Sequence, residues 1–207
     1  MTYYYYKLVT DNGGAPCVHD DVLSLAICKA QIRSTAGEGD WIFGFGGRST
    51  IGERLIYIAE ISNKVPNGDY YRNERFGGRP DRIYEWHGDR LRWKTGSLFH
   101  QDGEEAESDI GSPPYTKAAV LLSNNFRYFG AAGTEDYRDS FPAISEAITN
   151  LGRGHRVNHP EELEQELGKL HQHIWSHHKV QKIGEPTESD KGRRCNRTEG
   201  DVQRGSC

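Results

Sequence analysis

The chain has 207 residues, of which 35% are hydrophobic and 11% aromatic, and its formal net charge is −4. A chain of this size folds as one domain, and its eleven tyrosines supply ring surface for a core where aliphatic side chains are scarce. The negative charge and a pI near 6.1 argue against a protein that coats duplex DNA by neutralising phosphates, while leaving room for a local basic pocket.

The sequence carries no sign of a membrane segment or of an oxidising compartment. No apolar run approaches the roughly 20 residues that cross a bilayer, and residues 1–6 lack the regions of a signal peptide. We therefore expect a cytoplasmic protein. Neither disulfides nor structural zinc are expected, because no C-x-x-C pair occurs among the four cysteines, Cys17, Cys28, Cys195 and Cys207.

The first part of the chain predicts a strand, a turn and a helix. Residues 3–10 are rich in tyrosine and other strand formers, and the turn residues Asp-Asn-Gly-Gly follow at 11–14. The apolar run that comes after two aspartates predicts a helix over 22–33. This helix would place Lys29 and Arg33 on one face.

Two strands come next, and glycines interrupt the first of them. Residues 41–47 and 54–61 predict an antiparallel pair. Gly44, Gly46 and Gly47 indicate that the first strand ends in a bulge or is closely approached, either by packed backbone at a barrel corner or by a ligand.

The middle of the chain alternates polar loops with one hairpin. Arginines and aromatic residues interleave in the long loop at 63–82, as on a single-strand-binding surface or on a solvated loop. Residues 82–86 and 91–94 flank a turn and predict a hairpin. The acids of the exposed loop expected at 102–114 suit either a two-carboxylate nuclease or simple solvation.

The last part predicts two strands, two helices and a tail. Strands are expected at 118–122 and 126–129, and helices at 142–151 and 160–178. Large apolar residues almost vanish after Gly184, so residues 1–183 are predicted to form a single domain and 184–207 a disordered tail. The final helix carries an apolar stripe that an interaction protein could use for dimer contact: Leu163, Leu167, Leu170 and Ile174.

Two short strings carry most of the chemical information, Asn-Asn-Phe-Arg-Tyr-Phe-Gly at 124–130 and Gly-Arg-Gly-His-Arg at 152–156. Arg127 and Arg156 can pair with phosphate in a planar fork, and the rings beside Arg127 can stack on bases. His155 can transfer a proton near neutral pH. The two strings indicate nucleotide recognition or nucleotide chemistry.

Strand geometry would separate Arg127 from its neighbours. Alternation along a strand points Arg127 to one side and Phe126 and Tyr128 to the other. Arg127 then faces a ligand or solvent, or it braces the fold by stacking on a ring or binding a carboxylate.

Several large enzyme classes are not indicated, because their sequence motifs are missing. The chain has no dinucleotide fingerprint, phosphate-binding loop, nucleophile elbow or H-E-x-x-H helix, and we predict no cofactor. His173 and His177 have the spacing of metal ligands on a helix. However, no carboxylate or cysteine matches them, and a polar helix face explains them as well, so we predict no metal site.

The order of several motifs resembles a known family, the second type of nucleotide modification associated domain, found in bacterial and phage systems of DNA base modification. The resemblance spans about residues 3 to 175. It rests on Asp11-Asn12-Gly13-Gly14-Ala15-Pro16, Leu23-Ser24-Leu25-Ala26-Ile27-Cys28-Lys29, Gly39-Asp40-Trp41-Ile42-Phe43-Gly44-Phe45-Gly46-Gly47, Phe126-Arg127-Tyr128-Phe129-Gly130 and Gly154-His155-Arg156.

A weaker similarity concerns the fold. The order of strand, helix and paired strands is similar to the PUA-like barrels of pseudouridine synthases and archaeosine transglycosylases, including EVE and ASCH domains, which hold a modified base or RNA nucleotide. The segment 63–175 is longer than such barrels need. We therefore expect an α+β domain with a small, mostly antiparallel, PUA-like β-barrel or curved sheet, covered by helices near 22–33, 142–151 and 160–178.

Three functions remain open at this point. The first is a binding module for a nucleotide, or a nucleic acid carrying a modified base, in a DNA modification or phage-defence system. The second is an enzyme acting on such a substrate, and the third is a homodimeric interaction protein. The expected catalytic residues are His155 and Lys29, and the expected nucleotide-binding residues are Asn12, Gly13, Arg33, Gly46, Gly47, Arg79, Phe126, Arg127, Tyr128 and Arg156.

Overall fold

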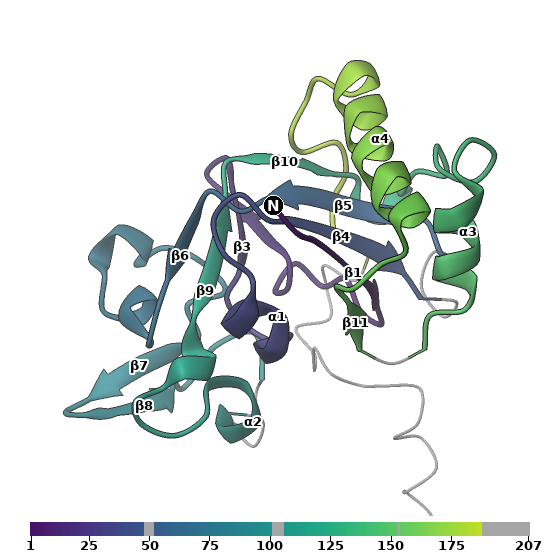
Figure 1. Cartoon of the computed structure of the whole chain (residues 1–207). Coiled ribbons are helices and arrows are strands. Elements are labelled where there is room, and N and C mark those ends of the chain that lie inside the picture. Colours follow the sequence, from purple (N-terminus) through teal and green to yellow (C-terminus); the bar gives the residue numbers. More distant parts are fainter. Residues whose placement is uncertain (48–51, 101–105, 153, 188–207) are drawn as a thin grey trace, which may run out of the picture.

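Figure 1 shows the computed structural model of the chain, in which residues 1–47, 52–100, 106–152 and 154–187 are described. Its main sheet has five strands in the order β10-β5-β4-β1-β11. Within this sheet β1 and β4 are parallel and the other neighbours antiparallel, as predicted for β4 and β5. The strand bounds are β1 Tyr3–Leu8, β4 Trp41–Gly46, β5 Leu55–Glu60, β10 Asn125–Tyr128 and β11 His155–Arg156.

The tyrosine run in β1 is explained by burial of this sheet on both faces. Side chains alternate across a strand, so Tyr4 and Tyr6 belong to one hydrophobic cluster and Tyr3 and Tyr5 to another. All four rings are buried. A strand that is covered on both sides needs apolar surface at every position, and tyrosine supplies it with a polar tip.

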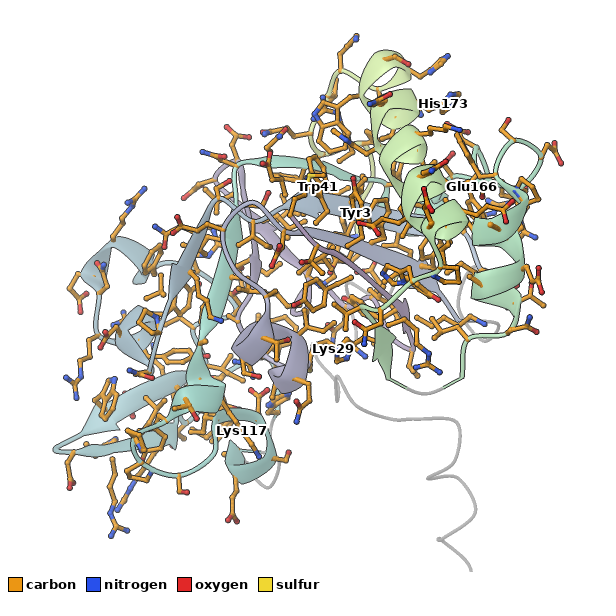
Figure 2. The ribbon with its side chains drawn as sticks, viewed as in Figure 1. Tyr3, Lys29, Trp41, Lys117, Glu166 and His173 are labelled. Atoms are coloured by element: carbon orange, nitrogen blue, oxygen red, sulfur yellow. The ribbon has the colours of Figure 1, made fainter. Side chains whose placement is uncertain are left out.

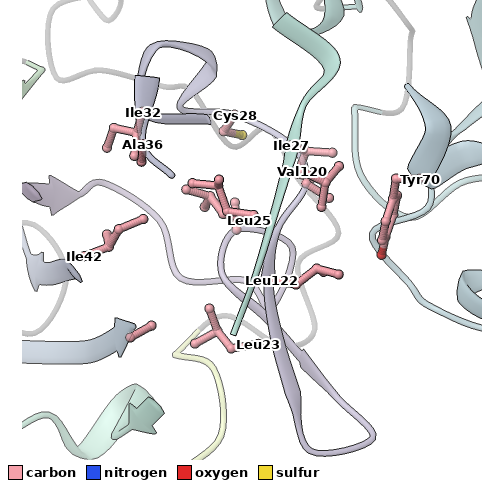
Figure 3. Packing of buried hydrophobic residues seen from close by; sticks show 14 of the residues in the cluster. Leu23, Leu25, Ile27, Cys28, Ile32, Ala36, Ile42, Tyr70, Val120 and Leu122 are labelled. Atoms are coloured by element: carbon pink, nitrogen blue, oxygen red, sulfur yellow. The ribbon is translucent and has the colours of Figure 1, made fainter. Parts of the chain in front are cut away.

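A second sheet and a separate hairpin form the other half of the domain. The second sheet has the order β2-β3-β9-β6, and β7 pairs with β8 alone, as the hairpin prediction required. Leucines of β3 and β9 pack with α1 and β4 in the core between the sheets (Figure 3). The bounds are β2 Cys17–His19, β3 Val22–Leu25, β6 Asn63–Val65, β7 Tyr84–His87, β8 Arg90–Trp93 and β9 Val120–Ser123.

The helix predicted over 22–33 is wrong. Val22–Leu25 is strand β3, hydrogen-bonded to β2 on one side and to β9 on the other. Cys28 and Lys29 then adopt left-handed backbone, with φ of 56° and 46°, so α1 begins only at Ala30 and ends at Thr35. A short apolar run fits a strand buried by two neighbours as well as it fits a helix, and here the pairing decides.

The two predicted C-terminal helices are confirmed, and they cover one face of the main sheet (Figure 1). The apolar stripe of α4 lies in the cluster that also holds Tyr3 and Tyr5. Because the stripe is buried in the chain's own core, it offers no surface for the dimer contact considered above. The helix bounds are α2 Ala106–Ile110, α3 Pro142–Thr149 and α4 Glu161–His177, and the short 3-10 helices are η1 Asp69–Tyr71, η2 Glu74–Phe76, η3 Thr116–Ala118 and η4 Gly130–Ala132.

The described residues thus form an α+β domain of mostly antiparallel open sheets, and their strands do not close into a barrel. No helix in this part of the chain is long and apolar enough to span a membrane. Most of the tail predicted at 184–207 lies outside the described residues. Within its described beginning, the Glu185 carbonyl accepts from the Ala131 N–H at 2.8 Å.

Candidate functional site

Two residues expected to carry chemistry meet at Tyr6. Strand β11 pairs with β1 so that His155 lies opposite Tyr6, and directly opposed residues of an antiparallel pair share one face of the sheet. The Lys29 Nζ lies 4.7 Å from the centroid of the Tyr6 ring, a cation–π contact. Figure 2 shows Lys29 beside α1, on the side of β11. We call Lys29, His155 and Tyr6 the Lys–His site.

The surroundings of His155 keep its imidazole neutral. Partial burial lowers the pKa of His155 below its ordinary value of 6.5, and the positive charges of Lys29 and Arg156 lower it further. The ring lies 6.0 Å from that of Tyr4, and within the described part of the chain it forms no hydrogen bond. A neutral, half-buried imidazole next to an ammonium group can accept a proton from a ligand or bind an anion with its neighbour.

A buried cluster of polar side chains adjoins this site at the Tyr6 hydroxyl. The Tyr6 hydroxyl lies 2.9 Å from that of Tyr57, and the Tyr128 hydroxyl donates to the Asp11 carboxylate at 2.9 Å. Burial raises the pKa of all three tyrosines, and the charge of Asp11 raises it further. The tyrosines therefore remain protonated donors. Sequence reasoning missed Tyr6, Tyr57 and Asp11 as parts of the site. Strand alternation in β1 could have suggested Tyr6, but Tyr57 lies in β5 and Asp11 in the loop after β1.

Because the charge of Lys29 lowers the pKa of His155, removing that charge should shift this pKa measurably. Lys29→Gln should raise the pKa of His155, because a positive charge is removed while burial still holds the pKa below 6.5. NMR titration of the histidine Cε1–H signals would measure the shift, with the exposed Lys169→Gln as a control. An unchanged His155 titration in Lys29→Gln would contradict the proximity of the two groups.

The lowered pKa of His155 also predicts how the free energy of unfolding depends on pH. Since the folded pKa of His155 lies below its unfolded value, the unfolded chain binds this proton more readily. The free energy of unfolding should therefore decrease as pH falls below about 6.5, and His155→Gln should weaken that dependence. Urea denaturation at several pH values would measure it.

Arg33 is a brace in the core. Its side chain is completely buried, and its guanidinium donates to the carbonyls of Cys28, Ala119 and Asp109 at 2.6 to 2.9 Å. It also donates to the Asp109 carboxylate at 2.6 Å. With its donors bound inside the protein, Arg33 has no access to a phosphate, and Asp109 is not one of the solvated loop acids expected at 102–114.

Arg79 is likewise committed to protein acceptors. Its Nη2 donates to the Ser24 hydroxyl at 2.6 Å, and its Nε donates to the Tyr70 hydroxyl at 2.9 Å. The Asp81 carboxylate lies beside Nε at 3.4 Å. Arg79 also donates to the carbonyls of His19 and Cys17 and so ties the loop at 63–82 to the second sheet, whereas Arg72 and Arg75 of this loop are exposed.

Arg127 lies on the opposite face of β10 from Phe126 and Tyr128, as strand alternation predicted. Phe126 and Tyr128 are buried in the core and cannot stack on a base. The Arg127 guanidinium lies 4.4 Å from the Trp175 ring centroid and donates to the carbonyls of Phe126 and His178. This geometry is that of an arginine bracing α4 against the sheet.

Arg156 and His155 lie on different faces of the main sheet. Arg156 lies opposite Tyr5, whereas His155 lies opposite Tyr6. Tyr5 lines an open cavity of about 330 Å³ between α3 and the start of α4, together with Glu146 and Glu162. Arg156 is exposed and donates to the His155 carbonyl at 3.0 Å.

Four further residues that were expected to contact a nucleotide shape the backbone in this structure: Asn12, Gly13, Gly46 and Gly47. Asn12 closes a turn by accepting the Gly14 N–H at 3.0 Å, and Gly13 has a φ of +81°. The N–H groups of Gly46 and Gly47 donate to the carbonyls of Arg54 and Leu8. The register between β4 and β5 shifts after Gly44, and the extra residue lies on β5 and not on the glycine-containing strand for which a bulge was considered.

The histidines of α4 contact a carboxylate from another segment. His178 Nε2 lies 3.0 Å from Asp136 Oδ2, and His173 Nε2 lies 3.8 Å from the same oxygen. Among the residues that the structure describes, no three His, Cys, Asp or Glu side chains come together as metal ligands would.

Fold and site together define a small α+β domain that carries a lysine and a neutral histidine over a buried tyrosine cluster. The family model described as nucleotide modification associated domain 2 matches residues 1–193, and the chain belongs to this family. Comparisons with curated proteins and with solved structures found no match. Family membership associates the chain with nucleotide modification systems.

Proposed function

We propose that this protein binds a nucleotide, or a modified base within a nucleic acid, at the Lys–His site. The observation that carries the proposal is the meeting of Lys29 and His155 at Tyr6, with a half-buried imidazole that forms no hydrogen bond in the described chain. The family's association with nucleotide modification supports the choice of ligand.

The two side chains offer complementary interactions. The Lys29 ammonium attracts a phosphate, and neutral His155 accepts from a base N–H or donates through its other nitrogen. A bound phosphate would raise the pKa of His155, so binding is expected to take up protons below neutral pH. The Tyr6 hydroxyl is held by its hydrogen bond with Tyr57, which keeps the Tyr6 ring in place against Lys29.

Lys29→Gln is expected to weaken nucleotide binding at least about tenfold, the cost of losing one charge-assisted contact of roughly 1.5 kcal/mol. Isothermal titration with a panel of canonical and modified nucleotides would measure it. Glutamine removes the charge and keeps a polar, somewhat shorter side chain, and Lys169→Gln, on the exposed side of α4, is the matched control. Equal affinities for wild type and Lys29→Gln would remove Lys29 from the site.

The lowered pKa of His155 favours a second candidate, an enzyme in which His155 is the general base. A neutral imidazole can take a proton from an attacking hydroxyl or from the base itself, while Lys29 stabilises developing negative charge. Mass spectrometry of modified oligonucleotides incubated with the protein would detect a product. A mass change that persists in His155→Gln would rule out this role.

A further inference from the structure

A second basic surface lies on the β7–β8 hairpin, apart from the Lys–His site. In Figure 1 the hairpin lies at the end of the molecule away from α3 and α4. Arg90 and Arg92 alternate with Leu91 and Trp93 in β8, so the two arginines share the outer face. Lys94 directly follows the end of β8, and its N–H donates to the Ile83 carbonyl at 2.8 Å, which continues the same alternation. All three are exposed. We call Arg90, Arg92 and Lys94 the hairpin cations.

None of the hairpin cations forms an ion pair with a residue in the described ranges. The carboxylate opposite Arg92, that of Glu85, shares their face and lies 3.0 Å from His87 Nε2. The three cations outnumber this carboxylate and repel one another, and an anionic partner relieves that repulsion.

The inner face of the hairpin makes this surface rigid. Trp86 donates its indole N–H to the Gly68 carbonyl at 3.0 Å, and Tyr115 accepts the Leu91 N–H at 3.0 Å. The Arg72 Cζ lies 3.7 Å from the centroid of the Trp86 ring. Because the backbone of β8 is held in place, Arg90 and Arg92 keep a fixed spacing of about 7 Å, the distance between alternate residues of a strand.

We propose that the hairpin cations bind the phosphate backbone of a nucleic acid strand. A straight row of cations at constant spacing matches a polymer of regularly spaced phosphates, and the arginines add planar, bidentate contacts. This assignment goes beyond the Lys–His site, since it makes the ligand a polynucleotide and not only a free nucleotide. It is also compatible with the net charge of −4, because the positive charge is confined to one strand.

The proposal can be tested by fluorescence anisotropy, with a labelled duplex of about 20 base pairs and with its single strand. Binding is measured from about 50 to about 200 mM salt. The triple variant Arg90→Ala, Arg92→Ala, Lys94→Ala should lose more than roughly tenfold in affinity at the lowest salt. The slope of log K against log salt for the duplex should fall by about 2.7, or about 0.9 for each lost phosphate contact. Arg90→Lys with Arg92→Lys should retain the slope, because the charges remain.

The control variant removes three exposed lysines at the other end of the molecule, Lys169, Lys179 and Lys182. An equal loss in this control, or an unchanged slope in the hairpin variant, would overturn the proposal. So would binding to vesicles of anionic lipid without binding to either oligonucleotide. Mononucleotide titration distinguishes the two sites, since the hairpin variant should retain the mononucleotide affinity of the wild type, and Lys29→Gln should not.

Discussion

Asp109→Asn is expected to lower the free energy of unfolding by about 3–5 kcal/mol, because it leaves the Arg33 charge buried without its counter-ion. Arg33 and Asp109 are both fully inaccessible at their side chains and are joined at 2.6 Å. Tyr84 donates to the second Asp109 oxygen at 2.9 Å. Asparagine can accept one of these bonds but supplies no negative charge. Guanidinium or urea denaturation followed by circular dichroism would measure the loss.

A matched control uses an exposed ion pair. Glu135 lies 3.5 Å from the Arg54 Nε, with both side chains more than two-fifths exposed, and Glu135→Gln should change stability by less than about 1 kcal/mol. Replacing both members of the buried pair, Arg33→Met with Asp109→Leu, should cost less than the two single changes together. Equal losses for Asp109→Asn and Glu135→Gln would show that the buried pair is unimportant.

Gly44→Ala is the second change with a large expected effect, about 3 kcal/mol of destabilisation. A Cβ at this position would lie 2.2 Å from Tyr57 Cε1 and 2.7 Å from Leu8 Cδ1. The Tyr57 ring cannot move aside easily, because it is fully buried and its hydroxyl is held by Tyr6. Thermal and denaturant unfolding would measure the cost.

Gly152→Ala is the control for that substitution. A Cβ on Gly152 would meet no heavy atom within 4 Å, so the change should be nearly neutral. If Gly44→Ala is as stable as Gly152→Ala, the close packing of Tyr57 on β4 is wrong. Since Tyr57 also contacts Tyr6, Gly44→Ala should in addition weaken nucleotide binding at the Lys–His site.

Elements with strong local signals could be predicted from the sequence. The tyrosine-rich run of β1, the turn between β7 and β8 and the 3.6-residue stripe of α4 are each contained in a short window. The separation of Arg127 from its aromatic neighbours follows from strand alternation in the same way. Such signals depend on neighbours within a few residues, so the rest of the fold does not alter them.

The arginines show why the site could be predicted only in part. Arg33, Arg79 and Arg127 were expected to bind a nucleotide, and in the structure they donate to carbonyls and carboxylates of the chain itself. A guanidinium satisfies both kinds of acceptor equally well. Which acceptor it meets depends on burial, and burial of a charged residue depends on segments far away in the sequence.

By itself the sequence determined the family, the two C-terminal helices and most strands, and it singled out Lys29 and His155 as candidate site residues. Only the tertiary structure decided that residues 22–25 form a strand, because β2 and β9 hydrogen-bond to both of its edges. The tertiary structure also decided which of the candidate site residues lie close together. The pairing of β1 with β11 joins the two ends of the domain and sets His155 opposite Tyr6. Register between distant strands depends on hydrogen bonds and packing that no local window contains.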